Sequence, residues 1–333
     1  MVTEAGECPA VVARQLERNA PLIAALADRL RTIPPRAVAT IARGSSDNAA
    51  TYARYLLETQ LGVLTASSPP SVSSIYGART DMTDTLVLTM SQSGRSPDLL
   101  TASRGAKDAG ATVIAIVNDE ASPLAELASA IIPVGAGVER SIAATKSFIA
   151  TLTAVAQLTA AWSGDRSLHA ALELLPEKLD AAWRLDWSAA IEPLAAAEHL
   201  FVVARGLNFG IAQEAALKFK ETCGLHAEAF SAAEVQHGPM TLVGRNFPVL
   251  AFLPDDDARP GVEDSVAAFR RQGATVLTVG GSGEGALPMV ESHTLLLPIV
   301  QALAFYRILD EVAARRGRNP DAPPHLAKVT ETL

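Results

Sequence analysis

The chain has 333 residues, of which 49% are hydrophobic, and its formal net charge is −8. This length suits two ordinary domains or one large one, and the apolar content is sufficient for a full core. The negative charge argues against a broad nucleic-acid surface, so an anionic ligand would need a local site.

The sequence shows no sign of membrane insertion or export. Its longest apolar stretch, residues 295–306, is interrupted by Pro298 and Gln301 and is shorter than the roughly 20 residues that cross a bilayer. The first ten residues contain acids and no apolar centre, unlike a secretory signal. Cys8 and Cys223 form neither a disulfide framework nor a zinc pattern. We expect a cytoplasmic protein that needs no metal or organic cofactor.

A helix is predicted over residues 9–33, and an internal repeat follows it. Gly110-Ala111-Thr112-Val113 recurs as Gly273-Ala274-Thr275-Val276, and IARGSSDNAATYA from Ile41 has its counterpart in VARGLNFGIAQEA from Val203. Each copy alternates short Val/Ile/Leu/Thr runs with helical segments, which implies right-handed crossovers and a parallel sheet covered on both faces.

We therefore predict an α/β fold of two tandem, doubly wound parallel-sheet domains with connecting helices. The expected segments are an N-terminal helical segment (1–36), a first α/β domain (37–163), connecting helices (164–196), a second α/β domain (197–318) and a C-terminal tail (319–333). The tail is rich in proline and too polar for a core, so by itself it is typical of a frayed terminus.

A loop of small polar residues follows the strand-like run at residues 85–90. Ser91, Gln92, Ser93 and Ser96 surround Gly94, and Pro97 and Asp98 are typical of a helix start after a Ser96 N-cap. Hydroxyls and backbone N–H groups at a helix N-terminus bind oxyanions. A plain capped turn would need only Ser96, so we favour a phosphate site.

The matching turn after the first strand contains Ser45, Ser46 and Asp47, and open α/β sheets bind ligands at this edge. Ser46 is the better candidate there, because a serine at position 45 also suits a helix cap. The second copy has Asp255, Asp256 and Asp257 where the first has its serine loop. Aspartates repel phosphate, so we expect the anion site in the first copy alone.

Glu214, Lys218 and Glu221 are spaced four and three residues apart, so one helix face carries all three. A solvated salt-bridge stripe would have the same spacing. However, the surrounding alanines, Leu217 and Phe219 indicate a largely buried helix, where a carboxylate needs a partner or a purpose. The spacing alone leaves both readings open.

His237 lies in a His-Gly-Pro turn, and an imidazole suits acid/base chemistry near neutral pH. A lone histidine is more often structural. A Ser/His/Asp hydrolase is excluded because no G-x-S-x-G elbow is present, and a P-loop is excluded because Gly-Lys-[Ser/Thr] is absent.

Six motifs in order resemble the sugar isomerase (SIS) family, in particular the isomerase half of the glucosamine-6-phosphate synthases. They are SQSGRSPD, SIAATKSF, EAALKFKE, HAEAF, EVQHGP and the tail LAK, and the resemblance extends from about Pro9 to Lys328. It implies tandem flavodoxin-like domains.

The resemblance also implies roles for individual residues. Ser46, Ser91, Gln92, Ser93 and Ser96 match the sugar-phosphate site. Glu221 matches the glutamate that moves a proton between C1 and C2, and His237 matches the ring-opening histidine that reaches in from the neighbouring subunit. Lys328 matches the lysine that meets the open-chain carbonyl, while Glu214 and Lys218 match supporting polar positions. A homodimer is therefore expected, with His237 acting across its interface.

The chain also departs from the synthases. Ala144, a weaker substrate-binding candidate, stands where they have a serine in a VASTK stretch. Arg95 replaces a glutamate in the serine loop, where we expect it to add a positive charge. The chain begins Met1-Val2-Thr3, so we expect no glutaminase domain and no ammonia derived from glutamine. In this it resembles stand-alone isomerase-type glucosamine-6-phosphate deaminases, which release fructose 6-phosphate and ammonia.

Three alternatives stay open at this point. The chain could synthesise glucosamine 6-phosphate from free ammonia, or could act on another phosphosugar with or without deamination. It could also be a non-enzymatic sugar-phosphate sensor, although a sensor has no use for Glu221, His237 and Lys328 together and usually needs an output domain.

Overall fold

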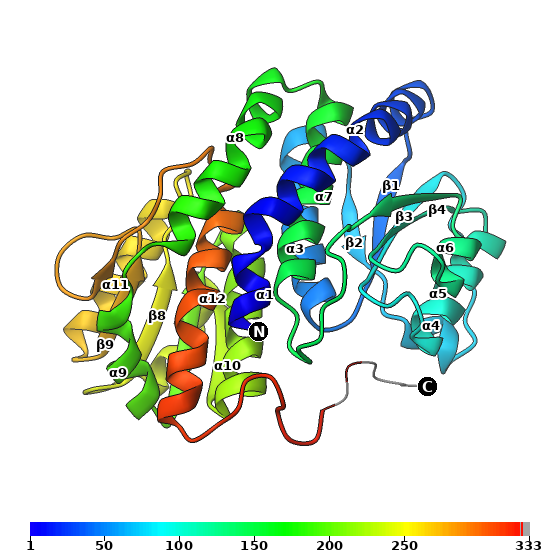
Figure 1. Cartoon of the computed structure of the whole chain (residues 1–333). Coiled ribbons are helices and arrows are strands. Elements are labelled where there is room, and N and C mark those ends of the chain that lie inside the picture. Colours follow the sequence, from blue (N-terminus) through cyan, green and yellow to red (C-terminus); the bar gives the residue numbers. More distant parts are fainter. Residues whose placement is uncertain (327, 329–333) are drawn as a thin grey trace. The chain divides into compact units, whose positions relative to one another are not determined.

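The computed structural model describes residues 1–326 and Lys328. These residues divide into two compact units, each with its own sheet (Figure 1). The first-sheet unit contains Ala10–Glu139, Lys146–Glu173 and Lys328, and the second-sheet unit contains Met1–Pro9, Arg140–Thr145 and Leu174–Leu326.

The first sheet has five parallel strands in the order β2-β1-β3-β4-β5, drawn in blue to green in Figure 1. The strands are β1 (Ala37–Ile41), β2 (Thr65–Ser67), β3 (Thr85–Ser91), β4 (Thr112–Val117) and β5 (Ala130–Pro133). The intervening helices are α3 (Ser45–Leu61), α4 (Ser71–Ser74), α5 (Pro97–Asp108) and α6 (Pro123–Leu127). Six consecutive residues of β3 are buried, as expected of a parallel strand covered on both faces.

The second sheet repeats this topology, because its order β10-β9-β8-β6-β7 again places the first strand between the second and the third. Its strands are β6 (His199–Ala204), β7 (His226–Ser231), β8 (Pro248–Phe252), β9 (Thr275–Val279) and β10 (Ala286–Leu287). The connections contain η1 (Gly206–Asn208), α10 (Phe209–Cys223), η2 (Glu234–Gln236), η3 (Pro239–Leu242) and α11 (Arg259–Arg271).

Six further helices of the described residues complete the two units. They are α1 (Val2–Gly6), α2 (Cys8–Thr32), α7 (Lys146–Ser163), α8 (Arg166–Trp183), α9 (Ser188–Ala196) and α12 (Leu297–Arg315). The helix predicted over residues 9–33 and the helices predicted after residue 163 are thus confirmed. In the second-sheet unit α12 packs against α10 (Figure 1). Both helices are largely buried.

The predicted α/β fold of two tandem parallel-sheet units is confirmed. The repeat did not reveal β2, β5, β7 and β10, which lie at the sheet edges and have between two and six residues. In the described part of the chain, no helix combines the length and apolar character that a membrane span requires.

Candidate active site

The glutamate helix α10 carries a buried ion-pair cluster in the second-sheet unit. Lys218 Nζ lies 2.5 Å from Glu221 Oε2 and 3.2 Å from Glu214 Oε1. The side chains of Glu214 and Lys218 are 1% and 0% exposed, whereas that of Glu221 is 21% exposed. The solvated-stripe alternative is therefore wrong, and Glu221 is the one member of the three that solvent reaches.

The charge of Lys218 depends on its two carboxylate neighbours. Burial lowers the pKa of the Lys218 ammonium, but attraction to Glu214 and Glu221 more than offsets this, and the net pKa is raised. Lys218 therefore carries a positive charge beside Glu221 at neutral pH. A cation there both orients that carboxylate and stabilises its negative charge.

The serine loop lies at the carboxyl end of β3 in the first-sheet unit. Ser91 Oγ accepts the Gly94 N–H at 3.0 Å, and Ser93 Oγ accepts the Arg95 N–H at 3.3 Å. Gly94 has a φ of 63°, and a Cβ on it would lie 2.2 Å from Ser122 Oγ. Only glycine fits there, so the sharp turn is set by the backbone.

The two predicted phosphate loops are neighbours because β1 and β3 are paired in parallel. Their loops leave the same edge of the sheet at its switch point, the usual ligand site of such folds. Arg43, which precedes α3, donates from Nε to Asp98 Oδ2 at 2.9 Å, and the Asp98 side chain is 1% exposed. This ion pair joins the first loop to the start of α5.

Ser96 occupies the N-cap position that the sequence predicts, whereas Ser45 is not the N-cap of α3. Ser96 is the N-cap residue of α5 and Pro97 follows it, but the Ser96 side chain makes no capping hydrogen bond. The N-cap of α3 is Gly44, so Ser45 is the first residue of that helix, followed by the half-buried Ser46. The Ser96 hydroxyl is therefore not needed for capping.

A carboxylate on a neighbouring loop orients the guanidinium group of Arg95. Its Nη2 lies 2.7 Å from Asp119 Oδ2, and both side chains are substantially exposed. The side-chain hydrogen bond from Arg95, with a smaller contribution from the Ala121 N–H, lowers the pKa of Asp119. The positive charge expected at the serine loop is thus shared with Asp119.

His237 is exposed and follows η2 in the second-sheet unit. Its backbone N–H donates to Glu234 O at 2.9 Å, while Val235 between them is buried. This short turn comes after the carboxyl end of β7. Glu221, in contrast, lies in the last turn of α10, shortly before β7 begins. The structure does not bring Glu221 and His237 of one chain together.

The tail lysine has a buried partner that sequence reasoning missed. Lys328 Nζ lies 3.2 Å from Glu139 Oε2, and the Glu139 side chain is fully buried. Glu139 also accepts the Ser147 Oγ–H at 2.7 Å and the Ser147 N–H at 3.2 Å, at the start of α7. Glu139 thus ties Lys328 to the start of that helix.

Two other sequence predictions concern this region. Ala144 is half-buried in the irregular segment before α7. The predicted closing tail 319–333 falls partly outside the described residues, since 327 and 329–333 are not among them.

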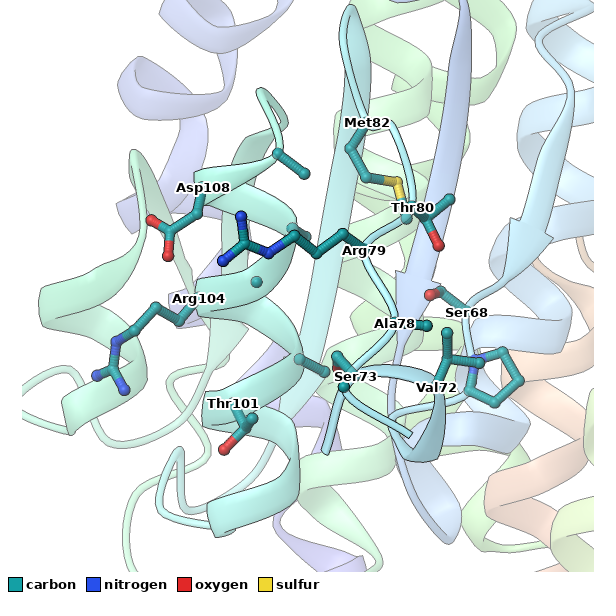
Figure 2. Close-up of a pocket in the computed structure, with 16 residues that line it drawn as sticks. Ser68, Val72, Ser73, Ala78, Arg79, Thr80, Met82, Thr101, Arg104 and Asp108 are labelled. Carbon is teal, nitrogen blue, oxygen red and sulfur yellow. The ribbon is translucent and has the colours of Figure 1, made fainter. Parts of the chain in front are cut away.

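A separate pocket of about 360 Å³ lies in the first-sheet unit and includes none of the predicted site residues. It is formed by α4, the segment after it and α5 (Figure 2). Arg79 extends from that segment towards α5, which carries Arg104 and Asp108. All three charged side chains are exposed. In residues 1–326 and Lys328, no group of three or more His, Cys, Asp or Glu side chains could hold a metal ion.

Comparisons with known proteins place the chain in a family. The SIS domain model matches residues 33–161 and 193–312. A glutamine–fructose-6-phosphate aminotransferase from Symbiobacterium thermophilum is 30% identical over 315 residues, which cover 88% of this chain and 51% of that protein. The chain therefore spans about half the length of this relative.

Solved structures agree on the architecture. A candidate phosphosugar isomerase from Silicibacter pomeroyi DSS-3 is 42% identical, with a TM-score of 0.91 over 96% of this chain and 99% of the other. A glucosamine-6-phosphate deaminase from Thermotoga maritima has a TM-score of 0.80 over 99% of both chains. At 24% identity, the latter likeness shows a shared fold.

Proposed function

Because the chain belongs to the SIS domain family, we propose that it converts glucosamine 6-phosphate and water to fructose 6-phosphate and ammonia. The observation that carries this proposal is the partly exposed carboxylate of Glu221, held at 2.5 Å by the buried ammonium of Lys218. A fixed carboxylate that solvent reaches is suited to accept and return a proton.

The chemistry begins with the open-chain aldose. Glu221 removes the proton from C2 and returns it at C1, while the amine nitrogen loses one proton and O1 gains one, so that the C2 amine becomes a ketose imine and the C1 aldehyde becomes an alcohol. Water then adds across the C2–N double bond and gives C2 a hydroxyl group. The proton of this hydroxyl passes to the nitrogen, the C2–N bond breaks, and the C2 ketone and ammonia are released. A positioned acid/base group contributes about 10²–10⁴-fold to such a reaction.

The phosphate supplies binding energy at a distance from C1 and C2. In this proposal Ser46, Ser91, Gln92, Ser93 and Ser96 hold it, at the switch point between β1 and β3. Each hydrogen bond to a charged phosphate oxygen contributes about 1.5–3 kcal/mol. That energy keeps the reacting carbons against the catalytic groups.

The remaining roles belong to the exposed turn after η2 and to the C-terminal tail. His237 opens the sugar ring, and Lys328 meets the open-chain carbonyl. Because His237 and Glu221 lie at opposite ends of β7, we assign His237 to the site of a partner subunit in a homodimer. Ala144 and Ser45 are weaker candidates for sugar contacts.

The test is to incubate the purified chain with glucosamine 6-phosphate and to measure ammonia and fructose 6-phosphate separately. Equal release of both products, lost in Glu221→Gln, supports the proposal. Because glutamine keeps the size of the side chain, this variant removes the base with little change in packing. Absence of both products from the wild type would refute it.

A second candidate is aldose–ketose isomerisation without loss of ammonia. It is favoured by the 42% identity to the candidate phosphosugar isomerase. Phosphosugars without an amine, assayed in parallel, distinguish the two. An isomerase would convert them and would release no ammonia from the amino sugar.

A further inference from the structure

Tyr306 of α12 contacts the cluster on α10 from a distant part of the sequence. Its hydroxyl donates to Glu214 Oε1 at 2.9 Å across 92 residues of sequence, and its side chain is fully buried. The same oxygen of Glu214 also forms the ion pair with the Lys218 ammonium. One carboxylate oxygen is therefore shared between a neutral donor and a charged one.

The ammonium of Lys218 is shared unequally between its two carboxylates. It lies 2.5 Å from Glu221 and 3.2 Å from Glu214. Glu214 is the more buried of the two and would attract the cation more strongly if it were alone, because a low-dielectric environment strengthens ion pairs. The Tyr306 hydrogen bond partly satisfies Glu214 and reduces this competition.

We propose that Tyr306 is a positioning residue for the reaction. By donating to Glu214, it leaves the Lys218 ammonium against Glu221 and fixes the catalytic carboxylate in one orientation. The inference rests on the proposed role of Glu221, but the geometry of Lys218 can be measured without any assay of that role.

The first test is Tyr306→Phe, which removes one oxygen atom and keeps the ring. We expect kcat for glucosamine 6-phosphate to fall about 10- to 100-fold, while KM changes less than about threefold, because the phosphate site is untouched. Tyr52→Phe is the matched control, since Tyr52 of α3 is also fully buried. A kcat within about twofold of wild type for Tyr306→Phe would overturn the proposal.

A double-mutant cycle separates positioning from simple packing. In a Glu214→Gln background the competing charge is gone, so Tyr306→Phe should reduce kcat less than about twofold further. Equal losses in both backgrounds would mean that the hydroxyl supports the fold independently of Glu214, and would overturn the proposal. Thermal unfolding of each variant confirms that folded enzymes are compared.

Crystal structures provide a readout independent of activity. In Tyr306→Phe the Lys218 ammonium should lie nearer to Glu214 and farther from Glu221 than in the wild type. An unmoved ammonium would overturn the proposal even if the enzyme turned over. If the wild type released no ammonia, the proposed function would fail while this displacement still tested the role of Tyr306. Should Tyr306→Phe not fold, Glu214→Gln alone must keep Lys218 against Glu221, and separation of that pair would refute the inference.

Discussion

Glu221 and His237 lie at opposite ends of β7 within one chain. Glu221 is in the last turn of α10, five residues before β7 begins at His226, and His237 follows η2, six residues beyond Ser231. The six residues of β7 extend roughly 20 Å at about 3.3 Å per residue. Two groups at that separation cannot both reach C1 and O5 of one sugar.

This separation predicts complementation between two inactive variants. Glu221→Gln and His237→Ala should each be inactive alone. In a mixed dimer, one site receives Glu221 from one subunit and His237 from the other. Random pairing of equal amounts makes half the dimers mixed, so we expect roughly a quarter of wild-type activity after co-expression.

Subunit mixtures with a single defect provide the control. Two copies of Glu221→Gln that carry different affinity tags, co-expressed in the same way, should form dimers that stay inactive. If the co-expressed pair is no more active than either variant alone, His237 does not act in trans, and the assignment to the partner subunit is wrong.

The serine loop predicts a defect in binding rather than in chemistry. Ser93→Ala removes a hydroxyl whose contact within the loop, to the Arg95 N–H, is long at 3.3 Å. We expect KM for the sugar phosphate to rise about 10- to 100-fold, the equivalent of one hydrogen bond to a charged group. Steady-state kinetics should show kcat changed much less than KM.

Thr101→Ala is a suitable comparison because Thr101 is an exposed hydroxyl on α5, four residues beyond Pro97, to whose carbonyl it donates. It should leave KM unchanged. A Ser93→Ala variant with the KM of the wild type would exclude this serine from the phosphate site.

Local patterns in the sequence were sufficient for the fold class and for the grouping of the charged side chains on α10. The Gly-Ala-Thr-Val repeat marks β4 and β9, which occupy equivalent positions in the two sheets. Glu214, Lys218 and Glu221 could be grouped because they belong to one helix, where spacing determines which side chains share a face.

Contacts between distant residues could not be predicted in this way. Tyr306 and Glu214 are 92 residues apart, and Lys328 and Glu139 are 189 apart. Tyr306 lies in an apolar stretch of the sequence, and the pattern of that stretch does not indicate that its hydroxyl has a polar partner. The short edge strands were missed for a related reason, since two or three residues do not establish a periodicity.

Glu139 offers a test of the tail. Glu139→Gln removes the charge that faces Lys328 Nζ at 3.2 Å but keeps an oxygen for the Ser147 hydroxyl. Without the ion pair, the lysine should be held less firmly at the site. We expect kcat to fall about 10- to 100-fold, as for loss of one charge-assisted hydrogen bond.

The comparison is with Lys328→Ala and with the double variant. Because both changes break the same pair, their effects should be less than additive. Ser147→Ala, which keeps both charges, should retain most of the activity. Full activity in Glu139→Gln would mean that Lys328 reaches its working position without this carboxylate.

The buried ion pairs of Lys218 predict that the free energy of unfolding decreases at alkaline pH. The pKa of Lys218 is raised above its ordinary value of 10.5, because the two carboxylates outweigh the effect of burial. A raised pKa in the folded state means that the unfolded chain releases this proton first. The stabilisation is thus complete below about pH 10.5 and is lost as the pH rises through the folded-state value.

Lys218→Met removes that contribution and leaves Glu214 as a buried carboxylate without its ammonium. Breaking a buried ion pair in this way costs about 3–5 kcal/mol, so the free energy of unfolding at pH 8 should fall by that amount. Urea unfolding between pH 8 and pH 11 measures both effects. Above pH 10.5 the free energy of unfolding should decline less steeply in the variant, by at most about 1.4 kcal/mol per pH unit. Parallel slopes in the two proteins would mean that folding does not raise the pKa of Lys218.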